Sequence, residues 1–142
     1  MIVPDINLLV YAYNTDAPDH QRARVWWEAV LSSSRPVGLP WATMLGYLRL
    51  MTNRRVVIEP FSPSEAIGHV RSWLERPQAS VLVPGPRHLD LLDDLMAAGK
   101  ATGELTTDVH LAALTIEHQA ELCSNDANFA RFPGLRWSNP LR

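Results

Sequence analysis

Three aspartates of this 142-residue chain occur in similar local settings. Asp5 ends the first apolar run, Asp108 opens an apolar helical stretch, and Asp126 follows a short apolar run. In a parallel α/β sheet, such positions gather at the carboxyl ends of the strands, where these folds bind their ligands. Because three neighbouring carboxylates repel one another unless a cation neutralises them, the pattern predicts a divalent metal site. Oxygen-only ligation favours Mg²⁺, with Mn²⁺ as the alternative.

The spacing of apolar residues predicts strands that alternate with helices. Short strands are expected at 2–3, 37–39, 80–83, 122–123 and 135–137. Helices are expected at 7–13, 23–31, 41–51, 66–74, 88–99 and 108–118. Ser64 is the expected cap of the fourth helix, and Thr106, Thr107 or Asp108 of the last. The alternation predicts one α/β domain over residues 1–142, with a mostly parallel sheet covered on both faces.

Composition excludes several classes of protein. The longest strictly apolar stretch, residues 8–13, is too short to cross a bilayer. No basic segment precedes an apolar one at the N-terminus, so we expect no signal peptide and a cytoplasmic location. Cys123 is the only cysteine, which excludes an intramolecular disulfide and indicates a small buried filler. The net charge of −2 gives no global basic field for nucleic acid, although Lys100 is the only lysine among thirteen basic residues.

Three segments resemble the signature blocks of PIN-domain ribonucleases, and more narrowly of the VapC toxins of VapBC toxin–antitoxin pairs. They are DINLLVYA at 5–12, DVHLAAL at 108–114 and SNDANFARFPGLRW at 124–137. The resemblance spans nearly the whole chain. It implies a three-layer α/β/α sandwich with a central parallel sheet and Mg²⁺-dependent cleavage of RNA. It also implies a homodimer and a cognate VapB-like antitoxin that occupies the acidic cleft.

The resemblance also implies roles for individual residues. Asp5, Asp108 and Asp126 match the metal-site aspartates of the family. Four further positions match residues that support the site or bind substrate. Asn7 matches a residue that orients the first aspartate, Ser124 a hydroxyl that lines the site, Asn128 a frequent aspartate position, and Arg49 an arginine that follows a helical glutamate.

The chain departs from the family at that glutamate. The residue three positions before Arg49 is Gly46, which reduces the usual four carboxylates to three. Glu104 and Glu117 flank Asp108 and could compensate. Glu117 is the poorer candidate, because nine residues of helix place it roughly 13 Å along the axis. If the missing carboxylate matters, Gly46→Glu is expected to tighten metal binding.

The arginines, tryptophans and histidines give weaker indications. Arginine suits bidentate phosphate contacts, so Arg49 and at least one of Arg131 and Arg136 are expected to contact RNA. The tryptophans at 26, 27, 41 and 73 lie on or beside helical apolar faces, which favours core or dimer packing over base stacking. The five histidines share no ligand spacing, and no metal-binding histidine is expected.

The expected chemistry is attack on phosphorus by a water that a tightly held Mg²⁺ activates. One alternative is phosphoryl transfer through an aspartyl phosphate on Asp5. That route usually employs a lysine at a strand end, whereas Lys100 lies between Gly99 and Gly103. A second alternative is an inactive binding module that retains the fold and grips RNA or a partner, and Gly46 gives it weight.

Overall fold

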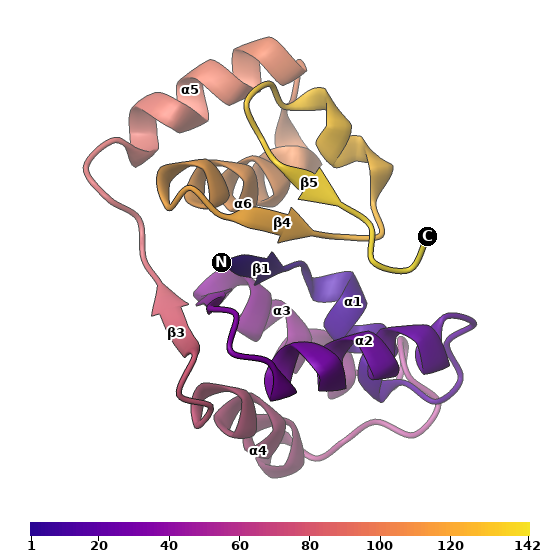
Figure 1. The fold of residues 1–142 in the computed structure, drawn as a ribbon. Coiled ribbons are helices and arrows are strands. Elements are labelled where there is room, and N and C mark those ends of the chain that lie inside the picture. The colour runs from indigo at the N-terminus through magenta and orange to yellow at the C-terminus, as the bar shows by residue number, and fades with distance from the viewer.

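The chain forms one parallel sheet between two layers of helices in a computed structural model that describes residues 1–142 (Figure 1). The five strands have the order β3-β2-β1-β4-β5, and every neighbouring pair is parallel. They are β1 (Ile2–Pro4), β2 (Val37–Pro40), β3 (Ala79–Leu82), β4 (Glu121–Cys123) and β5 (Trp137–Ser138). The prediction of a mostly parallel sheet is therefore confirmed, and no antiparallel strand is present.

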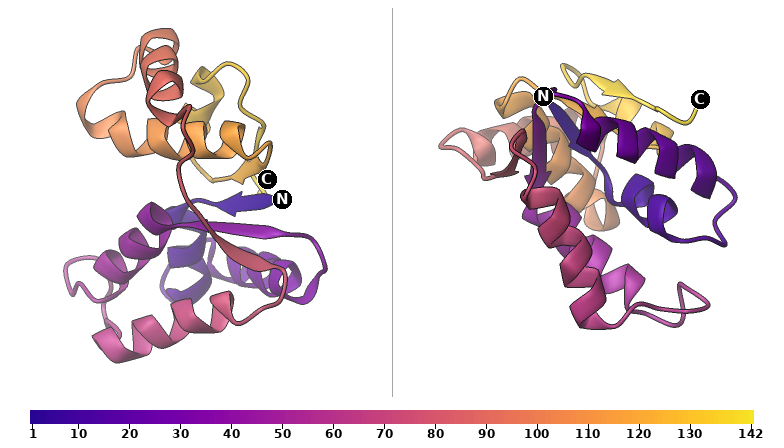
Figure 2. Two further views of the ribbon diagram at one scale, coloured as in Figure 1. Left: turned by 90° about the vertical axis from the view of Figure 1, so that its left-hand side faces the viewer. Right: turned by 60° about the horizontal axis from the view of Figure 1, so that its bottom comes forward.

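Six α-helices cover the sheet. They are α1 (Ile6–Tyr13), α2 (His20–Ser32), α3 (Trp41–Met51), α4 (Pro63–Leu74), α5 (His88–Gly99) and α6 (Thr106–Glu117). Two 3₁₀ helices, η1 (Gly103–Leu105) and η2 (Ala127–Arg131), flank α6 and β4. Helices α1 to α4 lie on one side of the sheet and α5 and α6 on the other, as Figure 1 and the left view of Figure 2 show. This is the predicted three-layer sandwich.

The two hydrophobic cores follow from the alternation of side chains along the strands. Ile2 and Val3 are neighbours on β1, yet Ile2 belongs to a cluster of 19 buried residues and Val3 to a cluster of 12. Leu122 and Cys123 divide between the same clusters on β4. Burial raises the pKa of the Cys123 thiol to about 11, which keeps it protonated and agrees with its expected role as a filler.

Two predicted helix caps are wrong. The cap of α4 is Ser62, whose hydroxyl accepts the Glu65 N–H at 3.1 Å while the Glu65 carboxylate accepts the Ser62 N–H. This capping box excludes Ser64, which lies inside the helix. Helix α6 continues directly from η1, with Leu105 at the cap position and no side-chain cap. Asp108 is therefore in the first turn of α6 without a capping role.

The tryptophans have unequal environments. Trp27 and Trp73 are buried in the larger core and pack edge to face, with ring centroids 5.7 Å apart. Trp73 also donates its Nε1–H to the Tyr13 hydroxyl at 2.8 Å. Trp41, by contrast, is 54% exposed, so its indole does not serve the core.

No helix has the length and apolar content needed to span a membrane.

Candidate active site

The candidate site lies where the strand order reverses. From the central β1 the chain proceeds to β2 and β3 on one side, and it returns to add β4 and β5 on the other. The carboxyl ends of β1 and β4 therefore flank the crevice in which open α/β sheets bind ligands. Asp5 directly follows β1, and the segment 124–126 directly follows β4.

Asp5 is held in place by both of its carboxylate oxygens. Its Oδ1 accepts the N–H of Ile6 at 2.7 Å, which caps α1, and its Oδ2 accepts the hydroxyl of Ser124 at 2.7 Å. The residue is only 7% exposed. Burial raises the pKa of Asp5, the two hydrogen bonds oppose that shift, and the charge of Asp126 adds to it.

Ser124 joins the ends of the two strands. Besides donating to Asp5, its Oγ accepts the Asn7 Nδ2–H at 3.2 Å and the Asp126 backbone N–H at 3.0 Å. A hydroxyl has one donor and two acceptor sites, so this fully buried group is saturated. Asn7 therefore acts on Asp5 through Ser124, whereas the resemblance implied that it orients the aspartate itself.

Asp126 begins the 3₁₀ helix η2, and its Oδ1 accepts the Asn128 N–H at 2.9 Å. The Asn128 side chain is exposed and accepts a hydrogen bond from the Arg131 guanidinium at 3.2 Å. Arg131 also donates to the carbonyl of Gly99 at 3.4 Å. These contacts place one fixed guanidinium at the edge of the acidic group.

Asp108 faces the other two aspartates from the first turn of α6. Its pKa is raised to about 6, chiefly by burial and then by the charges of Asp5 and Asp126, while Arg131 opposes the shift. Asp5 and Asp126 are therefore near enough to Asp108 for their charges to act on it. The three aspartates approach one another at the crevice, and their role as metal ligands stays a prediction.

The donor set suits a hydrated hard cation. No group of three or more His, Cys, Asp or Glu side chains is arranged so that it could hold a metal ion. The three aspartates are therefore not preformed as a set of direct ligands. Mg²⁺ dehydrates reluctantly and is usually bound through one or two carboxylates and several waters, so these aspartates suit it as partners of a hydrated ion. Burial is the largest cause of the raised pKa values of Asp5 and Asp108, and neighbouring carboxylates add to it, so a cation would stabilise the charged forms. Asp5, Asp108 and Asp126 are the residues that would hold it.

The predicted phosphate-binding arginines do not all reach this crevice. Arg131 lies beside Asp108, as described above. Arg136 donates to the carbonyl of Gln119, which precedes β4, so it lies at the amino end of the strands. The prediction that at least one of Arg131 and Arg136 contacts RNA therefore rests on Arg131. Arg49 is exposed near the end of α3 and forms no ion pair or hydrogen bond through its side chain.

Comparison with known proteins identifies the family. The PIN domain family model matches residues 2–135. Ribonuclease VapC33 of Mycobacterium tuberculosis is 45% identical over 142 residues, which cover 100% of this chain and 99% of that protein. The chain belongs to the PIN-domain family. Ribonuclease VapC43 of the same species is 40% identical over 141 residues, covering 99% of this chain and 96% of its own, so the similarity within the family is to VapC ribonucleases.

Solved structures agree with this assignment at the level of the fold. A VapBC2 complex from Rickettsia felis, bound to a DNA fragment from the promoter, gives a TM-score of 0.70 at 15% identity and covers 98% of both chains. VapC20 of Mycobacterium tuberculosis, described as a sarcin–ricin loop cleaving toxin, gives a TM-score of 0.66 at 14% identity, with 96% of this chain and 99% of that one covered.

Gly46 stands where the resemblance implied a glutamate, and the side chain of Ile6 fills the space beside it. A Cβ atom built on Gly46 would overlap the Cδ1 of Ile6 and lie 2.8 Å from its Cγ1. Ile6 directly follows Asp5, so α3 does face the metal-site residues at this position. The expectation that Gly46→Glu tightens metal binding therefore stays a prediction, with the added condition that the Ile6 side chain must move to admit the new side chain.

The two glutamates considered as substitutes do not fill this gap. Glu117 accepts the Gly85 N–H at 2.9 Å, which is the main reason that its pKa lies below the ordinary range. It also approaches His88, so it is committed elsewhere. Glu104 is exposed in η1 and makes no side-chain hydrogen bond or ion pair. The place implied for a fourth carboxylate is therefore occupied by the apolar side chain of Ile6.

Several contacts around the site had no clear sequence signal. His88 Nε2 and His110 Nδ1 lie 2.9 Å apart, although the two histidines are 22 residues apart in the sequence. The Thr43 hydroxyl is fully buried and donates to the Pro4 carbonyl at 3.1 Å, which ties α3 to the end of β1. Asn139 bonds to Asn125, and the sequence indicated only a turn there, through the pair Asn139-Pro140.

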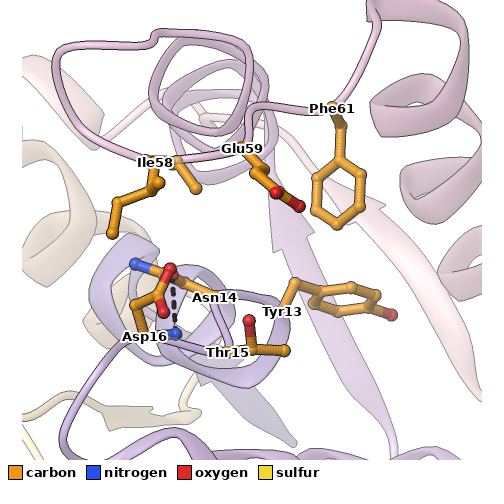
Figure 3. A pocket seen from close by; sticks show the side chains of 8 residues that line it. Tyr13, Asn14, Thr15, Asp16, Ile58, Glu59 and Phe61 are labelled. Atoms are coloured by element: carbon orange, nitrogen blue, oxygen red, sulfur yellow. Dashed lines mark hydrogen bonds between the residues drawn. The ribbon is translucent and has the colours of Figure 1, made fainter.

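A separate pocket of about 410 Å³ lies at the far end of α1 (Figure 3). Tyr13, Phe61 and Ile58 form its apolar part, and Asp16 and Glu59 supply exposed carboxylates. None of the three clustered aspartates lines it, and no basic side chain is present to bind phosphate. It is therefore distinct from the candidate active site.

The raised pKa of Asp108 predicts a pH-dependent stability for the metal-free protein. A carboxyl whose pKa is higher in the folded than in the unfolded state stabilises the fold when protonated. That contribution is complete below the ordinary value of 3.8 and is lost as pH rises through about 6. Thermal unfolding in EDTA should show a smaller loss of stability between pH 5 and 7 for Asp108→Asn than for the wild type. Equal losses would contradict the assigned pKa.

The contact between Ile6 and Gly46 predicts a compensating pair of substitutions. Gly46→Glu alone should lower the free energy of unfolding, because overpacking costs about 1–3 kcal/mol and loss of a helical glycine returns at most about 1 kcal/mol. Ile6→Ala combined with Gly46→Glu should recover stability and bind Mn²⁺ more tightly than Ile6→Ala alone. Gly68→Glu in α4 is the control, since nothing lies within 4 Å of its Cβ position. A Gly46→Glu protein as stable as Gly68→Glu would refute the steric argument.

Proposed function

We propose that this chain is a Mg²⁺-dependent endoribonuclease and the toxin of a type II toxin–antitoxin pair, acting in the cytoplasm. The observation that carries the proposal is the electrostatic coupling of Asp5, Asp108 and Asp126 at the switch point of a PIN-domain sheet. The names of its relatives, which are VapC ribonucleases, support RNA as the substrate.

The chain's own groups would divide the work of phosphodiester cleavage as follows. When bound, a divalent cation lowers the pKa of a water molecule and neutralises charge on the phosphate oxygens. Asp5 is fixed by Ser124 and Ile6, so its oxygens are oriented before ligand arrives. Arg131 is in position to pair with a phosphate of the RNA, since it already lies beside Asp108 and is held by Asn128.

The proposed partners are a VapB-like antitoxin and a second copy of the chain. Structural relatives are VapBC complexes, which supports the antitoxin. An antitoxin arginine could neutralise the acidic crevice through a charge-assisted pair. The exposed Trp41 and Ile67 line an apolar groove of about 310 Å³ between α3 and α4, and such exposed surface supports packing against another polypeptide.

The inactive binding module remains the second candidate, and the apolar wall at Ile6 favours it. Fewer carboxylates hold a cation less tightly. Such a module would bind RNA without cutting it at any concentration of Mg²⁺ or Mn²⁺. The cleavage experiment below separates the two functions.

Replacing any of the three aspartates should abolish cleavage without unfolding the protein. Asp5→Asn, Asp108→Asn and Asp126→Asn should each lower the rate at least about 100-fold, because even outer-shell changes at metal sites cost about 10- to 100-fold. Cleavage of total RNA with Mg²⁺, followed by sequencing of the new RNA ends, measures this. Asp93→Asn on the exposed face of α5 is the matched control and should cut normally. A wild-type rate in any of the three would show that this aspartate is wrongly assigned.

Arg131 and Arg136 should affect RNA binding differently. With cleavage suppressed by Asp126→Asn, Arg131→Gln should reduce the slope of log K against log salt by about 0.7, the value for one lost phosphate contact to a single strand. Arg136→Gln should leave the slope unchanged, because Arg136 lies at the opposite end of the strands. Fluorescence anisotropy at several salt concentrations provides the measurement. Equal slopes for both variants would show that Arg131 is a solvated surface residue that does not contact an RNA phosphate.

A further inference from the structure

The segment after β5 reaches back to the candidate active site through one side chain. Asn139 donates its Nδ2–H to the Oδ1 of Asn125 at 3.0 Å, and its own Oδ1 accepts the N–H of Leu141 at 3.0 Å. Leu141 is 4% exposed and belongs to the larger hydrophobic core. The amide of Asn139 is therefore fixed at both of its ends.

Asn125 is the residue between Ser124 and Asp126, and it is held from two directions. Its side chain is bonded to Asn139, and its backbone N–H donates to the Oδ1 of Asn7 at 3.3 Å. Asn7 in turn donates to the Ser124 hydroxyl, which donates to Asp5. The contacts form a continuous path from the buried Leu141 to the carboxylate of Asp5.

This path matters because the segment 124–126 carries a charge that its neighbours repel. The carboxylate of Asp126 lies near those of Asp5 and Asp108, and its charge acts on both. Repulsion favours movement of Asp126 away from the crevice. The bonds to Asn125 oppose that movement at the adjacent residue.

We propose that Asn139 is a positioning residue that holds the turn after β4, and with it Asp126, in place for cation binding. This inference rests on the proposed function and adds a residue outside the three signature blocks. Asn139 touches neither substrate nor cation in this role. It acts through Asn125, as an outer contact that keeps a ligand in the required geometry.

Asn53 supplies a matched control. Its Oδ1 accepts the N–H of Arg55 at 2.9 Å, which is the same local turn that Asn139 forms with Leu141, but Asn53 has no side-chain bond to the site. Serine at either position keeps a short acceptor for the turn and cannot span the distance to a second side chain. Asn139→Ser and Asn53→Ser therefore differ in the bond to Asn125.

The experiment measures Mn²⁺ binding by isothermal titration calorimetry and amide hydrogen exchange by NMR, both without RNA. Asn139→Ser should weaken Mn²⁺ binding about threefold or more. This is a smaller effect than the roughly 10- to 100-fold typical of residues that contact a metal-ligating side chain directly, because Asn139 acts through Asn125. Exchange at the Asn125 and Asp126 amides should be faster. Asn53→Ser should change neither quantity. Thermal unfolding of both variants shows that the comparison is made on folded protein.

A second variant removes the bond while keeping the branched shape of the side chain. Asn139→Leu has as many side-chain non-hydrogen atoms as asparagine but cannot donate to the Asn125 Oδ1, so it should also weaken Mn²⁺ binding. Unchanged or tighter binding in both Asn139 variants would overturn the inference. If Asp126→Asn weakens Mn²⁺ binding while the Asn139 variants do not, the proposed metal site stands and only the role of Asn139 fails. If wild type and Asp126→Asn bind Mn²⁺ equally, the metal site itself is wrong.

Discussion

Repulsion among three carboxylates is the constraint on which the rest of this structure depends. Asp5, Asp108 and Asp126 come from three separate elements, and the fold holds them together although burial and mutual charge raise the pKa of Asp5 and Asp108. An arrangement that opposes the stability of the metal-free chain is typical of functional sites, where charge is placed for a ligand. The parallel sheet makes this possible, because its switch point brings the ends of β1 and β4 side by side.

Neutral contacts, more than ion pairs, counter the repulsion. Ser124 satisfies all its hydrogen-bonding capacity between Asp5, Asn7 and Asp126, and no basic residue forms an ion pair with the three aspartates. A cation can therefore bind without first displacing an arginine or lysine. The side chain of Ile6 occupies the space beside Gly46, where the resemblance implied a fourth carboxylate.

Local patterns in the sequence were sufficient for the main helices and strands and for singling out the three aspartates. Helical spacing located α2, α3 and α5. Asp5 and Asp126 were recognisable from their positions after apolar runs, and Asp108 from its position at the start of an apolar helix. Contacts between residues distant in the sequence were not predictable in this way. The overlap of Gly46 with Ile6 and the bond of Asn139 to Asn125 depend on how α3 and the last turn settle against the sheet. The cap of α4 was predicted two residues too late, although Ser62 and Glu65 have the capping-box spacing and Pro63 stands at the first helical position.

The central claim is that these carboxylates gather to bind a divalent cation. An anomalous difference map from a crystal of the wild-type protein soaked in Mn²⁺ tests it most directly, since the signal locates the ion without reference to activity. We expect a single dominant peak bounded by Asp5, Asp108 and Asp126, with waters completing the coordination. A dominant peak elsewhere, for example between Asp16 and Glu59, or no peak at the three aspartates, would contradict it.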